Sequence, residues 1–148
     1  MESKYDSLAL KNQLSFPLYL CSKEIIRKYT PMLEKLNLTY TQYIVMMYLW
    51  ERKTSNVKDI SQILLLDSGT LTPLLKKLEA KEYITRVRST KDERNLEIAI
   101  AKKGLELRKK ALGIPQKISK YIDLSKEEIE TLHSLIYKVL INVIEEEK

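Results

Sequence analysis

Between residues 8 and 36, apolar side chains recur every three or four positions, which is the spacing of one face of an α-helix. The positions are Leu10, Leu14, Leu18, Cys21, Ile25, Ile26, Tyr29 and Leu33. They predict one long amphipathic helix with Pro17 near its first turn, where the missing N–H has no intrahelical partner. We expect Pro31 to bend or interrupt this helix further on.

Residues 43–50, with the sequence YIVMMYLW, are apolar on every side. A helix that is hydrophobic all round belongs in a protein core. A buried strand is the competing interpretation. The methionines and the polar TYTQ segment, which can cap a helix, favour the helical one.

Two shorter helical patterns follow, and a tight turn joins them. The first, NVKDISQILLL at residues 56–66, is amphipathic through Val57, Ile60, Ile63 and Leu64. The second begins after an N-cap at Asp67 or Ser68, with Pro73 near its first turn. Its predicted buried face consists of Leu71, Leu74, Leu75 and Leu78. Two short helices joined in this way form the helix-turn-helix pattern.

The next segments, YITRVRS and NLEIAI, have the composition of β-strands and flank the charged TKDER segment. Leu96, Ile98 and Ile100 fall on one face of the second strand, because side chains alternate along a strand. A hairpin with a basic tip that follows a helix pair makes a winged helix-turn-helix. We assign this DNA-binding domain to residues 37–101.

The last third of the chain returns to helical spacing. One helix should run from Lys102 to about Ile118, loosened at residues 113–115, and another should start at Ser125 with a capping box to Glu128. The apolar stripe of the last helix is Ile129, Leu132, Leu135, Ile136, Val139, Leu140 and Val143. A small winged domain cannot cover this stripe, so residues 1–36 and 102–148 are predicted to form a helical dimerisation region. The predicted fold is mainly α with a small β wing.

Composition narrows the function classes. The 148 residues fit one domain, and the single cysteine excludes an internal disulfide, which favours the cytoplasm. No apolar run is long enough to span a bilayer, so no membrane partner is expected. Three glycines exclude Gly-rich nucleotide loops, and a single histidine beside a single cysteine makes a zinc site implausible. We expect no enzyme, no metal and no cofactor.

Charge indicates a polyanionic partner. Between Lys76 and Lys110 there are twelve Lys or Arg residues and six Asp or Glu residues, so this segment carries the entire formal net charge of +6. A helix in the major groove of double-stranded DNA presents its N-terminal residues to bases and phosphates. The predicted DNA-binding residues are Ser68, Thr70, Thr72, Lys76, Lys77, Arg86, Arg88, Lys91, Asp92 and Arg94, where Asp92 orients an arginine. The alternative from another class is a helical protein-interaction adaptor without DNA binding.

The segment from Leu66 to Ile100 resembles the MarR family of bacterial transcriptional regulators. The signature is Asp92-Glu93-Arg94 in the wing followed by a strand and Gly104, and the resemblance covers nearly the whole chain. Ala101 stands where many members have a capping threonine. The resemblance is closest to the branch of organic hydroperoxide resistance regulators (OhrR). It implies a homodimer on an inverted-repeat operator, repressing an oxidative-stress or organic peroxide resistance operon.

Position 15 departs from that branch. In that branch the motif around this position resembles Leu-Cys-Phe. The resemblance implies that the cysteine is the peroxide sensor and that two tyrosines of the partner subunit hold it. Tyr29 and Tyr40 match these tyrosines. Ser15 disables this switch because a hydroxyl forms no sulfenic acid. The chain is either a natural non-sensing relative or one whose cysteine was replaced. Cys21 is interpreted as a buried structural cysteine. The other effector hypothesis is a repressor that a small phenolic, aromatic or lipophilic ligand releases from DNA.

Overall fold

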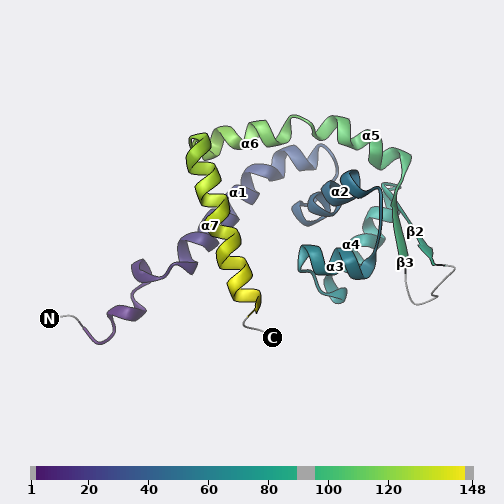
Figure 1. Ribbon diagram of the computed structural model, residues 1–148. Coiled ribbons are helices and arrows are strands. Elements are labelled where there is room, and N and C mark those ends of the chain that lie inside the picture. Colours follow the sequence, from purple (N-terminus) through teal and green to yellow (C-terminus); the bar gives the residue numbers. More distant parts are fainter. Residues whose placement is uncertain (1–2, 90–95, 146–148) are drawn as a thin grey trace. The chain divides into compact units, whose positions relative to one another are not determined.

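The computed structural model describes residues 3–89 and 96–145, and the chain divides into two compact units, Met1–Ile114 and Pro115–Lys148. Two 3-10 turns, Asp6–Leu8 and Leu10–Asn12, precede the first helix. The regular elements are α1 (Ser15–Glu34), α2 (Tyr40–Arg52), β1 (Thr54–Asn56), α3 (Val57–Leu64), α4 (Ser68–Ala80), β2 (Ile84–Arg88), β3 (Leu96–Ile100), α5 (Lys102–Ala111), α6 (Ile114–Ile122) and α7 (Lys126–Glu145) (Figure 1). The predicted fold class, mainly helical with a small sheet, is confirmed.

Helix α2 forms the centre of the first unit. Its all-apolar sequence predicted burial, and Tyr43, Val45, Met46, Leu49 and Trp50 are buried. It packs against α1, α3, α4, α5 and strands β1 and β3. The TYTQ segment caps it as expected, because the Thr39 side chain accepts from the backbone N–H of Gln42 while the Gln42 side chain accepts from the backbone N–H of Thr39.

The wing is part of a three-stranded antiparallel sheet with the strand order β1-β3-β2. The predicted hairpin pairs Ile84 with Ile100 and Arg88 with Leu96. The sequence did not predict β1, whose three residues pair with β3 from Thr54↔Ala99 to Asn56↔Glu97. As predicted, Ile98 is fully buried on the inner face of β3.

Gly104 lets α5 approach the sheet and α2 closely. A Cβ atom at this position would lie 2.1 Å from the Tyr83 carbonyl oxygen, well inside van der Waals contact. The Trp50 Nε1–H donates to the Gly104 carbonyl oxygen over 2.8 Å within the core. A glycine at position 104 is therefore required for α5 to pack here.

Helix α1 is shorter than its apolar pattern suggested. It begins at Ser15, and Leu10 lies in a 3-10 turn instead. Pro17 falls in the first turn as expected, but Pro31 does not end the helix, which continues to Glu34. The Thr30 hydroxyl donates to the Ile26 carbonyl oxygen over 3.1 Å, a back-bond to the carbonyl four residues earlier in the helix.

The second unit contains α7 and most of α6. The Ser125–Glu128 capping box is present, with the Ser125 backbone N–H donating to Glu128 Oε2 over 2.8 Å and the Glu128 N–H donating to Ser125 Oγ over 3.2 Å. Within the described part of α7, every predicted stripe residue is exposed, and Leu135 is 55% exposed. None of the described helices combines the length and the hydropathy needed to cross a bilayer.

We expect Ala101→Thr to raise the free energy of unfolding by about 1 kcal/mol. Ala101 is the N-cap of α5, with the extended φ of −86° and ψ of 165° typical of that position, and it makes no side-chain cap. A threonine hydroxyl could accept from an N–H of the first turn. Urea unfolding measures the change. Ala101→Val, which has the same shape without the hydroxyl, is the control, and equal stability of the two variants would contradict the capping argument.

Candidate nucleic-acid interface and sensor site

A short turn fixes where α4 begins. Leu65 has a left-handed φ of 51° at the end of α3, and the Ser61 hydroxyl donates to the Leu66 carbonyl oxygen across the turn. Asp67 is the N-cap of α4, since its Oδ1 accepts from the Thr70 N–H over 2.7 Å. Of the two predicted caps, Asp67 is therefore correct, and Ser68 is the first helical residue.

The two faces of α4 differ sharply. The four predicted leucines, Leu71, Leu74, Leu75 and Leu78, are buried. Ser68, Thr70, Lys76 and Lys77 are exposed, and Thr72 is half-buried. The polar first turn of α4 is thus presented to solvent, followed by the two lysines one to two turns later. This is the arrangement that a helix needs to enter a DNA groove.

The wing supplies the second part of the candidate interface. Arg88 is exposed at the end of β2, where the chain leaves the sheet. The predicted contacts Lys91, Asp92 and Arg94 lie outside the described residues. Their roles in DNA binding and in orienting an arginine therefore stay predictions.

Arg86 lies in a different environment from Arg88. Its Nη2 is 3.2 Å from Oε1 of Glu79 on α4, and only 17% of its side chain is exposed. Its Nε atom is buried without a hydrogen-bond partner among the described residues. This ion pair ties the base of the wing to the end of α4. Sequence reasoning missed Glu79, because only the chain reversal after α4 brings the two residues together.

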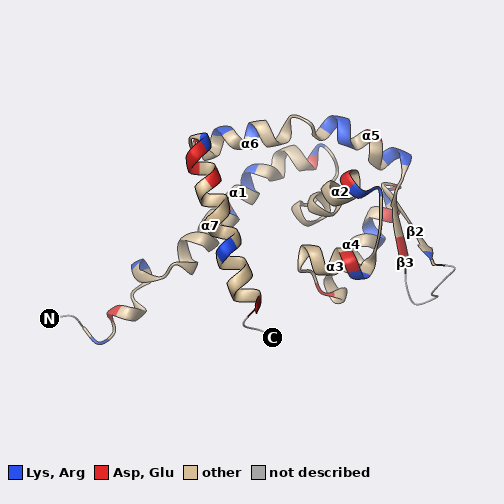
Figure 2. Ribbon diagram, in the orientation of Figure 1, with Lys and Arg blue, Asp and Glu red and all other residues tan. Residues whose placement is uncertain are grey.

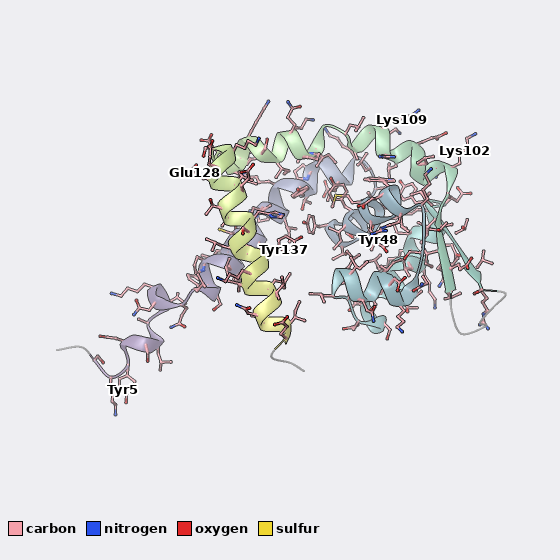
Figure 3. The ribbon with its side chains drawn as sticks, in the orientation of Figure 1. Tyr5, Tyr48, Lys102, Lys109, Glu128 and Tyr137 are labelled. Carbon is pink, nitrogen blue, oxygen red and sulfur yellow. The ribbon has the colours of Figure 1, made fainter. Side chains whose placement is uncertain are left out.

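Positive charge is not confined to α4 and the wing. Helix α5 carries Lys102, Lys103, Arg108, Lys109 and Lys110 against the single acid Glu106. Figure 2 shows these basic residues recurring along α5, and Lys102 and Lys109 are labelled there in Figure 3. Lys103 is paired with Glu82 over 3.6 Å. The charged segment of the sequence therefore covers several surfaces.

The predicted sensor residues fall into two groups. Ser15 is exposed at the first position of α1. Tyr29 lies in the same helix, and at 1.5 Å per residue this separation corresponds to about 21 Å along the helix axis. Tyr29 and Tyr40 lie together, with ring centroids 5.1 Å apart. Because α1 is continuous between Ser15 and Tyr29, Ser15 cannot reach the tyrosine pair of its own chain.

The two tyrosines belong to a larger aromatic cluster. Tyr43 lies 5.8 Å from Tyr29 and 6.4 Å from Tyr40, measured between ring centroids, and Trp50 lies 6.2 Å from Tyr43. Burial raises the pKa of Tyr29 and of Tyr40, and for Tyr29 the neighbouring Tyr40 adds to the rise. The buried setting therefore makes both phenols harder to ionise than a free tyrosine.

Cys21 differs from its interpretation as a buried cysteine. Its side chain is free and exposed in this chain. The reason is that the apolar side of α1 on which it lies is largely uncovered, and Leu14, Leu18 and Ile25 are exposed as well.

Comparisons with known proteins identify the family. The family description "Transcriptional regulator SarA/Rot" matches residues 27–111, which include α2, the helix-turn-helix, the sheet and α5. The chain belongs to this family of transcriptional regulators.

Within residues 3–89 and 96–145, no group of three or more His, Cys, Asp and Glu side chains is placed to hold a metal ion.

One relative and two solved structures define the similarity further. The chain is 45% identical over 140 residues to the organic hydroperoxide resistance transcriptional regulator of Bacillus subtilis (strain 168), covering 95% of each chain. It is 30% identical to reduced AbfR bound to DNA, a Staphylococcus epidermidis protein, with a TM-score of 0.78 and coverage of 96% and 99%. An Escherichia coli MarR mutant complexed with operator DNA, 20% identical with a TM-score of 0.81 and coverage of 94% and 99%, shares the fold.

We expect the free energy of unfolding to fall between pH 10 and pH 12. Burial, with Tyr29 and Tyr40 adding to it, raises the pKa of Tyr43 to about 12. A tyrosine with a raised folded-state pKa stabilises the fold below its ordinary value of about 10, and this contribution is lost as the pH rises towards 12. Urea unfolding across this range measures the decline, which Tyr43→Phe should reduce. The control Tyr5→Phe, at a 62% exposed tyrosine that precedes α1, should leave the decline unchanged.

Proposed function

We propose that this chain is a dimeric, DNA-binding transcriptional regulator that represses an operon for resistance to organic peroxides. The observation that carries the proposal is the division of α4 into a buried leucine face and an exposed face with Ser68, Thr70, Lys76 and Lys77. The name of the Bacillus subtilis relative supports the peroxide-resistance role. The structure of reduced AbfR bound to DNA supports DNA as the partner.

The DNA-binding mechanism follows from the two exposed elements. The first turn of α4 offers hydroxyls and helix N–H groups to bases and phosphates, and the lysines that follow reach the backbone. We expect the wing to contact the neighbouring minor groove through Arg88 and through Arg94, which lies outside the described residues. Arg86 acts indirectly, since its ion pair with Glu79 holds β2 against α4.

Exposed apolar surface supports the dimer. The described residues of α7 expose Ile129, Leu132, Leu135, Ile136, Tyr137, Val139, Leu140, Ile141 and Val143. So many large apolar side chains exposed on one helix are typical of an interface. A second copy is the favoured occupant, because Ser15 and the tyrosine pair can form one site only across two chains. Residues 1–36 and 102–148 would contribute the dimerisation helices, and residues 37–101 the DNA-binding domain.

Ser15 defines the regulatory state within this proposal. A cysteine thiolate at position 15 would attack the O–O bond of a hydroperoxide. The sulfur would take up one oxygen and become a sulfenic acid, and the rest of the peroxide would leave as an alcohol. The Ser15 hydroxyl cannot do this. The protein as it stands is therefore a repressor that remains on its operator in the presence of peroxide.

We expect the protein to bind a duplex of the promoter upstream of its own gene, with an affinity that falls as salt rises. Arg94→Ala should weaken this binding by about 1–3 kcal/mol if the wing reads the groove. Fluorescence anisotropy measures the affinity. Arg27→Ala, at an arginine paired with Glu24 on α1, is the matched control. Unchanged affinity of Arg94→Ala would remove the wing from the interface.

A protein-binding adaptor would show no salt-sensitive shift with the duplex in size-exclusion chromatography.

Ser15→Cys should restore release by peroxide. Cumene hydroperoxide should lower the duplex affinity of this variant by about 5- to 150-fold, the usual range of coupling between two sites, and leave the unmodified protein bound. The same titration of Cys21→Ser, alone and combined with Ser15→Cys, isolates position 15. Release of the unmodified protein by peroxide would contradict the locked-repressor proposal, and loss of that release in Cys21→Ser would assign sensing to Cys21 rather than to a bound ligand.

A further inference from the structure

Helices α1 and α4 of the first unit, like α3, end in the same kind of motif. At the end of α1, Asn37 has a left-handed φ of 55°, and the Leu38 N–H donates back to the Leu33 carbonyl oxygen over 3.0 Å. At the end of α4, Glu82 has a φ of 64°, and the Tyr83 N–H donates to the Leu78 carbonyl oxygen over 3.1 Å. Such an ending satisfies some of the last carbonyl groups of a helix but not all of them.

The two helix ends are joined by the side chains of two residues that closely follow α4. Lys81, the C-cap of α4, donates from Nζ to the Asn37 carbonyl oxygen over 2.6 Å. Tyr83 donates its hydroxyl proton to the Leu36 carbonyl oxygen over 2.9 Å in a buried hydrogen bond. The turn just beyond the carbonyl end of α1 therefore receives a positive charge and a neutral donor, and the positive charge suits the negative end of the helix dipole.

The same lysine also contacts the start of α2. Lys81 Nζ donates to Gln42 Oε1 over 3.0 Å. Gln42 is 3% exposed, and its Oε1 also accepts from the Thr39 backbone N–H in the capping box of α2. One ammonium group thus bridges the end of α1, the start of α2 and the end of α4.

The contacts of Lys81, a half-buried residue, distinguish it from the neighbouring lysines. Both of its acceptors are uncharged oxygens, and burial, followed by the nearby Lys77, lowers the pKa of Lys81. Lys76 and Lys77, only one turn earlier, are exposed. Sequence alone places all three lysines in one basic segment, but the contacts separate them.

We propose that Lys81 is a positioning residue that sets the placement of α4 relative to the turn between α1 and α2, and so controls how the recognition helix fits its operator. The inference rests on the proposed function, because it assumes that α4 reads DNA. The turn at residues 35–38 directly follows α1, the helix that holds Ser15 and Tyr29. A displacement of the end of α1 would move the acceptors of Lys81 and, with them, the C-terminal end of α4.

The test separates positioning from phosphate contact by measuring two duplexes over a range of salt. One duplex carries the promoter upstream of the gene for this chain, and the other is a scrambled duplex of the same composition. The variants are Lys81→Met, which keeps the aliphatic stem but removes the donor, Tyr83→Phe, which removes the parallel hydrogen bond, and the matched control Lys77→Met. Urea unfolding confirms that each variant is folded at the assay temperature.

Lys81→Met should weaken binding of the promoter duplex about tenfold, the loss of one charge-assisted hydrogen bond, and leave binding of the scrambled duplex and the salt slope unchanged. Tyr83→Phe should act in the same direction. Lys77→Met should weaken both duplexes and lower the salt slope by about 1.

Two outcomes would overturn the inference. A salt slope lowered in Lys81→Met as in Lys77→Met would make Lys81 a phosphate contact, and unchanged affinity for the promoter duplex would remove its positioning role. If the unmodified protein binds neither duplex in low salt, or binds both equally, the proposed function itself fails.

Discussion

The structure depends on covering most of the surface of α2, on which Met47 remains 38% exposed. This helix has no polar face along residues 43–50, so water is excluded only when other elements surround it. Helices α1, α3, α4 and α5 and two strands do so. The leucines of α4 are drawn inward by the same requirement, which leaves its hydroxyl and lysine side chains as the face turned to solvent. The candidate DNA surface is thus set by the packing of the core.

Elements with strong local signals could be predicted from the sequence. The burial of α2, the leucine face of α4 and the capping boxes at Thr39 and Ser125 each depend on residues within a few positions of one another. Strand β1 could not be predicted, because three polar residues carry no periodicity and their pairing with β3 joins distant parts of the chain. The start of α1 was also misjudged, since apolar spacing continues through the preceding 3-10 turns.

The candidate site shows the same limit. Composition placed Arg86 with the DNA-binding residues and counted Lys81 in the basic segment, but the fold engages both side chains internally. The contact from Lys81 to Asn37 spans 44 residues of sequence, and the pairing of Arg86 with Glu79 needs the turn after α4. A formal charge count therefore overstates the charge available to a partner. Exposure after folding decides which lysines and arginines can meet a phosphate.

The environment of Trp50 has a spectroscopic consequence. It is the only tryptophan of the chain, and its indole N–H is bonded to the Gly104 carbonyl oxygen where α2 and α5 meet. Its emission consequently reports on the first unit, while α7 carries no tryptophan. A comparison of tryptophan emission with far-ultraviolet circular dichroism, to which α7 contributes fully, would therefore reveal whether α7 and the first unit melt together or in separate steps.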